Sequence, residues 1–347
     1  MGKKKICVLG GGVIGLSTAL VLSKDYDVTI IADKFGNQTE SRKATAIWHV
    51  YLVPETHTVL SWAAETLQKL NEISIKYPES GVEQIRGVEL FRNSVENIPT
   101  WAHIPSHFEL LDQNEIEKYN THKGRNITEF EINQLTNHPV KWGYSIDAPA
   151  ADMDIYLSWL ESKLLNIESV EFDRRELTDI NEISPKYDCF VNCLGASAFS
   201  LFDDSAFLPY KGQYFTIPLC EEFPRNYIGD DDHPLGMAYV IPRKGKIMIG
   251  GCAEKNVDDL ELTLDWKETF KRASLYYPEL NSITQDLKVA PAIVGVRPCR
   301  AKGVRLELDN NNASLNTPLI HNYGHGGSGF SLSWGCANSV LELIKTI

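Results

Sequence analysis

Long hydrophobic runs and targeting signals are missing from this sequence of 347 residues. No apolar run approaches the roughly 20 residues that a membrane-spanning helix requires. Residues 1–5 lead directly into an apolar segment without the h-region of a signal peptide, and the C-terminal Lys345-Thr346-Ile347 is not a peroxisomal Ser-Lys-Leu signal. We therefore expect a cytoplasmic protein with no membrane partner.

The sequence has few basic residues: its 34 lysines and arginines are outnumbered by 46 acidic residues, and the formal net charge is −12. Binding of a polyanion needs a positive surface field, so we expect no nucleic acid partner. The 43% hydrophobic and 23% charged residues are typical of a globular protein with an ample core. At roughly 150 residues per domain, the length predicts two domains or one large elaborated unit.

Clustered metal ligands and paired cysteines are also lacking. The seven cysteines are odd in number and scattered, which indicates reduced, mostly buried thiols. The histidines show no H-E-x-x-H spacing, and no serine lies in a G-x-S-x-G turn. We therefore expect neither a metal site nor a serine nucleophile of that type.

A dinucleotide-binding pattern occupies the first forty residues. An apolar run at 6–9 leads into Gly10-Gly11-Gly12-Val13-Ile14-Gly15, and residues 16–22 then have helical spacing. Gly10 allows the tight turn, Gly12 lets a pyrophosphate approach the backbone, and Gly15 lets the helix and strand pack closely. The helix N-terminus presents free N–H groups and a positive dipole end to phosphates. A second strand ends at Asp33, where an acidic residue can bind a ribose hydroxyl. This pattern does not distinguish FAD from NAD.

The middle of the chain alternates between helical and strand patterns. Amphipathic helices are predicted at 58–77 and 153–167, and Asp152 or Asp154 can cap the second. Strands are predicted at 170–172 and 187–196, the latter ending at a glycine that abuts a dinucleotide. Alternating segments at 213–217, 237–241 and 246–250 indicate an inserted, more antiparallel sheet. The sequence thus predicts a parallel nucleotide-binding sheet interrupted by a second domain.

Two unusual segments lie near the C-terminus. Residues 295–300, Gly-Val-Arg-Pro-Cys-Arg, place two arginines three positions apart beside a proline. Residues 318–330 run from a strand through a glycine-rich loop into a helix at 331–344. A helix N-terminus aimed at a ligand stabilises negative charge, such as that of a reduced flavin ring.

With these segments in view, the chain resembles the D-amino-acid oxidase family, FAD enzymes of the glutathione-reductase-like class. The resemblance covers nearly the whole length, and its last two segments are specific in combination. The segments that carry it are Gly10 to Gly15, Ala32-Asp33-Lys34-Phe35, Thr39 to Ser41 with Trp48, Val191-Asn192-Cys193 with Gly195, Tyr239-Val240-Ile241-Pro242, Gly295 to Arg300, and His321 to Gly327.

The resemblance implies an α/β fold in which a Rossmann-like FAD-binding domain is interleaved with a mixed, largely antiparallel-sheet substrate domain. We assign residues 1–50, 141–200 and 290–347 to the FAD-binding domain. Residues 51–140 and 201–289 are then the substrate-binding domain. The residues implied to hold FAD are Gly10, Gly12, Val13, Ile14, Gly15, Asp33, Lys34, Thr39, Ser41, Leu177, Gly195, Gly326, Gly327, Ser328, Gly329 and Phe330.

The resemblance also implies three catalytic positions. Arg297 matches an arginine that forms a bidentate pair with the substrate carboxylate, for which its planar fork is well suited. Tyr239 matches a tyrosine whose hydroxyl binds the same carboxylate. Gly327 matches a glycine whose backbone carbonyl accepts a hydrogen bond from the substrate amine. Arg300 is expected to be structural.

The sequence departs from the family pattern around the expected substrate pocket, which comprises His49, Tyr51, Leu235, Tyr239 and Arg297. Mammalian relatives have a second lid tyrosine where Leu235 stands, and Tyr227 is the candidate replacement. A family glutamine next to Trp48 is replaced by His49. Relatives with acidic substrates carry an arginine after the Gly-Gly pair; here Cys252 comes after Gly250-Gly251, so a substrate side-chain carboxylate would be buried unpaired.

These matches imply oxidative deamination of D-amino acids by hydride transfer to flavin N5. Neutral or basic substrates are favoured over acidic ones, and the products are 2-oxo acids, ammonia and hydrogen peroxide, with molecular oxygen as acceptor. The resemblance leaves a homodimer open. Three alternatives are an oxidase of a secondary amine, imino acid or pathway-specific amine, a flavin-binding protein without turnover, and a nicotinamide-dependent dehydrogenase. The last is disfavoured because it gives the C-terminal glycine loop no role.

Overall fold

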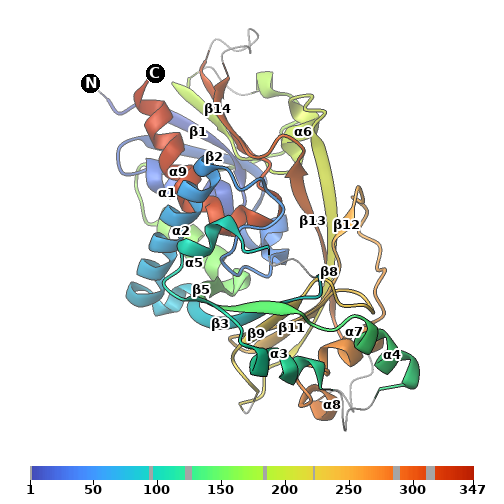
Figure 1. The fold of residues 1–347 in the computed structure, drawn as a ribbon. Helices are drawn as coiled ribbons and strands as arrows, with labels where there is room; N and C mark the ends of the chain where they lie inside the picture. Colours follow the sequence, from blue (N-terminus) through green and yellow to red (C-terminus); the bar gives the residue numbers. More distant parts are fainter. Residues whose placement is uncertain are drawn as a thin grey trace.

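The computed structural model describes residues 2–93, 97–121, 127–182, 186–221, 223–283, 290–309 and 317–347. Their main elements are two mixed sheets and a layer of helices, with the two chain ends lying near each other beside α9 (Figure 1). No helix of these ranges combines the length and the apolar character that crossing a bilayer demands. All seven cysteines are free, and six of them are buried, as expected.

The smaller sheet has six strands in the order β14-β15-β7-β1-β2-β6. All its neighbouring pairs are parallel except β14 with β15 at one edge. The central strands are continuous apolar runs because both faces of the sheet are covered. The strands are β1 Lys5–Gly11, β2 Asp27–Phe35, β6 Val170–Arg174, β7 Cys189–Asn192, β14 Arg305–Asp309 and β15 Leu319–Tyr323.

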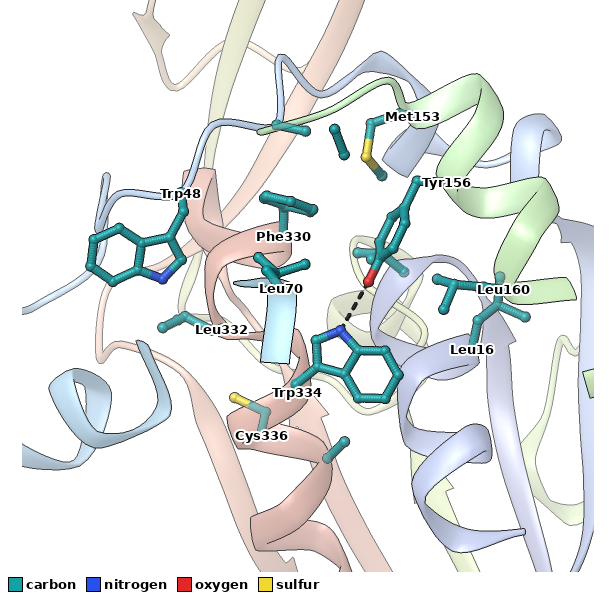
Figure 2. Close-up of a cluster of buried hydrophobic side chains, with 14 of the residues drawn as sticks. Leu16, Trp48, Leu70, Met153, Tyr156, Leu160, Phe330, Leu332, Trp334 and Cys336 are labelled. Atoms are coloured by element: carbon teal, nitrogen blue, oxygen red, sulfur yellow. Dashed lines mark hydrogen bonds between the residues drawn. The ribbon is translucent and has the colours of Figure 1, made fainter. Parts of the chain in front are cut away.

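Four helices build the core beside this sheet: α1 Val13–Leu22, α2 His57–Lys76, α5 Met153–Leu165 and α9 Gly329–Lys345. Helix α9 packs against both α1 and α2 (Figure 1). Asp152 caps α5 with a side chain that accepts from the Asp154 N–H, as the sequence predicts. Figure 2 shows Trp334 of α9 pointing toward Tyr156 of α5, and its Nε1–H donates to the tyrosine hydroxyl across 2.9 Å.

The larger sheet has nine strands and is antiparallel except where β3 pairs with β9. Its path is β12-β8-β11-β10-β9-β3-β5-β4, and β13 pairs with β8 outside this path. The strands are β3 Val82–Phe91, β4 Phe108–Leu110, β5 Trp142–Ala151, β8 Phe207–Pro218, β9 Tyr227–Asp230, β10 Ala238–Arg243, β11 Lys246–Gly250, β12 Glu254–Lys255 and β13 Ala292–Arg300. The predicted fold class is confirmed.

Short helices complete the described chain. Helices α3, α4, α7 and α8 lie on the far side of the larger sheet from the chain ends (Figure 1). Their bounds, with α6, are α3 Gln113–Asn120, α4 Glu129–Asn137, α6 Ser197–Leu201, α7 Trp266–Ala273 and α8 Leu280–Ile283. The 3-10 turns are η1 Gly36–Gln38, η2 Glu40–Lys43, η3 Pro78–Ser80, η4 Thr100–His103, η5 Ile180–Glu182 and η6 Gly326–Ser328.

Two strands within the segments assigned to the FAD-binding domain belong to the larger sheet. Strand β5 pairs with β3, and β13 pairs with β8 from Ala292 opposite Phe215 to Arg300 opposite Phe207. Figure 1 shows the long β8 and β13 running side by side from the region of α6 into the larger sheet. Sequence periodicity does not reveal the partner of a strand, so the domain boundaries stay a prediction.

Candidate active site

A cavity of about 830 Å³ is lined by residues of both sheets. This volume lies within the range of cofactor and ligand sites, ~300–1,000 Å³. One end is formed by the turn after β1 and by the ends of β2 and β7, and the other by β3, β8, β9, β10 and β13. The cavity therefore joins the predicted dinucleotide site to the predicted substrate site.

The glycine turn adopts the geometry that the motif predicts. Gly10 has φ +112°, and a Cβ there would lie 2.4 Å from the Cys193 carbonyl oxygen. A Cβ on Gly15 would lie 1.9 Å from the Gly10 carbonyl oxygen, so only glycine allows the helix to pack this closely. Gly10, Gly12, Val13 and Ile14 line the cavity, whereas Gly15 packs behind it.

The N-terminus of α1 fits a phosphate group. The first turn contains no acidic side chain, and the Ncap residue Gly12 leaves the first N–H groups without a local side-chain cap. The Ser41 hydroxyl accepts from the Val13 N–H at 3.0 Å. Helix dipole and free N–H groups favour an anion here, and Gly12 keeps the approach open.

The other residues predicted to hold the dinucleotide converge on the same end. Asp33, Lys34, Thr39, Ser41, Leu177 and Gly195 all line the cavity. Asp33 and Lys34 are exposed and lie 3.7 Å apart across an ion pair. Arg175 and Glu176, which the sequence analysis did not select, lie beside Leu177 in the wall. Their position after the short strand β6 is the signal that could have indicated them.

The C-terminal glycine loop forms the middle of the cavity. Gly326, Gly327, Gly329 and Phe330 line it, whereas Ser328 is fully buried and does not. The Ser328 hydroxyl accepts from the Tyr51 N–H at 2.7 Å and donates to the Tyr51 carbonyl at 2.9 Å. Ser328 therefore fixes the backbone of a pocket residue.

Two histidines lie in this wall, His325 buried and His49 half-buried. The ring of His325 is buried, its Nε2 has no hydrogen-bond partner among the described residues, and burial lowers its pKa to about 3. Burial and the nearby Arg297 charge lower the pKa of His49 to about 4. Both rings are therefore neutral at physiological pH. The unpartnered Nε2 of His325 and Nδ1 of His49 are polar positions that a bound flavin could satisfy.

Arg297 reaches the substrate end from β13. Its Nη1 donates to the Cys252 carbonyl at 3.3 Å, and its guanidinium carbon lies 5.7 Å from the centre of the Tyr51 ring. Gly212 on β8 makes room for it, because a Cβ there would lie 2.6 Å from Nη1. Among the described residues, no carboxylate lies within ion-pair distance of Arg297. The half-buried guanidinium is therefore available to pair with an anionic ligand.

Tyr239, on β10, lies near the Arg297 guanidinium. Its ring packs against the glycine pair, since a Cβ on Gly250 or Gly251 would come within 2.3 to 2.4 Å of it. Its hydroxyl has no hydrogen-bond partner in the part of the chain that the structure describes. Burial raises the pKa of Tyr239, which therefore stays protonated and can donate to a ligand carboxylate.

Four of the five predicted pocket residues line the cavity: His49, Tyr51, Tyr239 and Arg297. Leu235 does not. Its N–H donates to His233 Nδ1 at 3.2 Å, and Met237, two residues further on, lines the cavity. Tyr227, the suggested replacement for a lid tyrosine, does line the cavity and is buried.

Glu89 and Asp231 also line the wall, although the sequence analysis did not assign them to the pocket. Each lies in or beside a strand, where alternation in the sequence predicts which face of the sheet a side chain occupies but not which residue of the next strand lies opposite.

No group of three or more histidine, cysteine or carboxylate side chains within the described ranges could hold a metal ion.

A two-sheet fold whose glycine-turn cavity extends to an arginine without an ion pair in the described chain is typical of a dinucleotide-dependent oxidoreductase. The family model described as FAD dependent oxidoreductase matches residues 5–343. The chain is 32% identical over 340 residues to the D-amino-acid oxidase of Rubrobacter xylanophilus, covering 97% of this chain and 94% of the relative. It is 30% identical to the D-amino-acid oxidase of Dictyostelium discoideum, covering 99% and 92%, and 30% identical to human D-aspartate oxidase, covering 99% and 96%.

Solved structures share the fold at lower identity. Glycine oxidase from Bacillus cereus has a TM-score of 0.74 at 16% identity, covering 99% of this chain and 95% of that chain. L-Proline dehydrogenase from P. horikoshii has a TM-score of 0.71 at 19% identity, covering 99% and 94%. The protein belongs to the FAD-dependent oxidoreductase family that includes the D-amino-acid oxidases, and its cofactor is FAD. The predicted resemblance and cofactor are confirmed.

Proposed function

We propose that this enzyme oxidises D-amino acids, with neutral or basic side chains favoured over acidic ones. The observation that carries the proposal is Arg297, a guanidinium without an acidic partner among the described residues, in the wall that also contains Tyr239 and Gly327. A planar guanidinium matches the two oxygens of a carboxylate. The names of the relatives at 30% and 32% identity support an amino acid as the substrate.

The chain's own groups would orient the substrate by three contacts. Arg297 would bind the carboxylate by two parallel hydrogen bonds, Tyr239 would donate a further one, and the Gly327 carbonyl would accept from the amine. These contacts fix the carboxylate and the amine, and the cavity wall confines the side chain. The hydrogen on the reacting carbon then has one direction left, so selectivity for one enantiomer results from geometry. No side-chain acid or base is required at that carbon.

Bound FAD supplies the two-electron acceptor for the substrate's hydride. The amine must be neutral, so that its lone pair forms the carbon–nitrogen double bond as the hydride leaves. Water then converts the imino acid to a 2-oxo acid and ammonia, and molecular oxygen takes the two electrons to give hydrogen peroxide. Overall, one amino acid, one oxygen and one water yield these three products.

Acidic substrates are disfavoured by the residue after the glycine pair. Cys252 provides only its carbonyl, which already accepts from Arg297, so a second substrate carboxylate would find no added cation there. The secondary-amine alternative rests on His49 alone, since Leu235 lies away from the cavity. A cytoplasmic location and a homodimer are further proposals, and sedimentation of the purified protein tests the latter.

The test is a spectrum of the purified yellow protein before and after anaerobic mixing with single amino acids. We expect D-alanine, D-methionine and D-lysine to bleach the flavin and L-alanine, D-aspartate and N-methyl-D-alanine to do so far more slowly. Peroxide release in air should show the same order. Arg297→Ala should keep the flavin and lose most of the activity. A flavin that stays oxidised with every D-amino acid would overturn the proposal and favour a binding protein without turnover.

A further inference from the structure

Two carboxylates face the substrate end of the cavity from neighbouring strands. Glu89 on β3 lies opposite Gly229 on β9, and a Cβ on that glycine would come within 2.2 Å of Glu89 Oε2. The glycine therefore leaves room for the Glu89 side chain. Asp231 comes directly after β9, and both carboxylates line the cavity, Glu89 as a half-buried and Asp231 as an exposed side chain.

Asp230, the neighbour of Asp231, is an example of a carboxylate with a structural role, and its contacts serve as a comparison. Asp230 is fully buried, lies 2.7 Å from Arg92, and accepts a hydrogen bond from Tyr276. Glu89 and Asp231, in contrast, have no basic side chain within 4.0 Å in the ranges that the structure describes. Neither carboxylate therefore makes a contact ion pair in those ranges. At longer range the Arg297 charge offsets part of the effect of burial, which raises the pKa of Asp231.

Unpartnered hydroxyls surround the same place. Tyr144 and Tyr227 line the cavity with side chains that are 5% and 2% exposed, and neither hydroxyl has a hydrogen-bond partner in the described chain. Both tyrosines lie close enough to Glu89 for its charge to raise their pKa, after burial as the main cause. Two buried tyrosine side chains whose hydroxyls have no partner in the described chain indicate that a polar ligand group completes this wall.

Tyr51 connects this wall to the carboxylate clamp. Its ring lies beside the Arg297 guanidinium, and its hydroxyl lies beside Asp231, whose charge raises the pKa of Tyr51 in addition to burial. Glu55 also lines the cavity, and its carboxylate accepts from the Thr100 N–H at 2.9 Å. A ligand bound by Arg297 and extending along Tyr51 would thus enter a region lined by carboxylate side chains.

We propose that Glu89 and Asp231 bind the cationic end of a basic substrate side chain, such as that of D-lysine or D-arginine, while Arg297 binds its carboxylate. This inference rests on the proposed function and narrows its substrate class. The apolar stem of such a side chain can pack along Tyr51 and Met237. Burial and the neighbouring carboxylates raise the pKa of Glu89, and a bound cation would offset both effects.

The first test measures binding to the FAD-loaded protein without turnover. Calorimetry compares 6-aminohexanoate, which carries a carboxylate and a distal ammonium but no α-amine, with hexanoate, which lacks the ammonium. We expect 6-aminohexanoate to bind at least ~10-fold more tightly, since a hydrogen bond to a charged group changes binding by roughly 10- to 100-fold. Glu89→Gln and Asp231→Asn should each reduce this ratio about tenfold. Asp232→Asn, an exposed neighbour outside the cavity wall, is the matched control and should not change it.

The second test measures kcat/KM for D-lysine and D-norleucine, which have side chains of similar length and differ in the terminal ammonium. The D-lysine to D-norleucine ratio should exceed ~10 and fall in both cavity variants, with the flavin spectrum confirming that each variant is loaded. Equal ratios in the wild type and both cavity variants would overturn the cation site and leave the proposed function standing. If neither amino acid nor D-alanine reduces the flavin, the proposed function fails instead. If neither 6-aminohexanoate nor hexanoate binds, the ratio of kcat/KM for D-lysine to that for D-norleucine decides whether the cation site exists.

Discussion

Gly212→Ala tests whether the position of the Arg297 guanidinium, and not only its charge, determines activity. The added methyl carbon would lie 2.6 Å from Nη1 and 2.9 Å from the guanidinium carbon. Non-bonded contacts relax near about 3.5 Å, so the guanidinium must retreat by somewhat less than ~1 Å. The group that moves is the end of a flexible side chain, so the free energy of unfolding should change by at most ~1.5 kcal/mol, the cost of an off-rotamer torsion.

Activity should respond far more strongly than stability. A displacement of ~1 Å at a positioning group can cost about 100-fold, which corresponds to ~2.7 kcal/mol in kcat/KM. The assay is peroxide release with D-alanine, together with the absorbance of bound flavin and urea unfolding of the same preparation. We expect normal flavin content, a nearly unchanged unfolding midpoint and a kcat/KM reduced by about two orders of magnitude.

A double-mutant cycle identifies the cause. In the Arg297→Ala background the methyl group of Gly212→Ala has nothing to displace, so its further effect on the anaerobic rate of flavin reduction should vanish. An equal loss in both backgrounds would show that the methyl group contacts the ligand directly. An unimpaired Gly212→Ala enzyme would show that the guanidinium need not occupy this position. Either result refutes the reasoning.

Three further outcomes are expected. Tyr156→Phe leaves the buried Trp334 Nε1–H without its acceptor and should lower the free energy of unfolding by ~1–3 kcal/mol in urea titrations of the FAD-loaded protein; no change would mean that the bond in Figure 2 contributes nothing net. Gly12→Ala places a methyl group 2.9 Å from Ser41 Oγ at the phosphate end, so more of the purified protein should lack flavin absorbance, and full flavin content would argue against phosphate binding there. The pKa of His325 is about 3, below its unfolded value near 6.5, so the unfolded state binds more protons between those values and stability is lost as pH falls. From pH 7 to pH 5 this residue should account for about 2 kcal/mol, and His325→Gln should reduce the pH dependence of the unfolding free energy accordingly.

The sequence predicted the dinucleotide end of the site well because that end is local. Strand, glycine turn, helix and second strand succeed one another within forty residues, and each glycine has a steric reason that the structure shows at Gly10 and Gly15. The long helices were also predictable, because α2 and α9 bury one face with helical periodicity.

The substrate end was less predictable because it depends on pairing between distant strands. Glu89 meets Asp231 only because β3 pairs with β9 in parallel, which no local pattern encodes. Leu235 was placed in the pocket because mammalian relatives have a lid tyrosine at this position, but its N–H donates to His233 and it does not line the cavity. Ser328 was expected to contact FAD, whereas its hydroxyl binds the Tyr51 backbone.

The long antiparallel ladder of β8 and β13 places the carboxylate clamp on a different sheet from the glycine turn at β1. Substitutions in the larger sheet can therefore accumulate with little effect on dinucleotide binding, and substitutions in the smaller sheet with little effect on substrate binding. During evolution, substitutions at strand ends of the larger sheet could change the substrate specificity, while FAD binding at the smaller sheet is retained. This modularity is a physical reason why one architecture can serve many amine substrates.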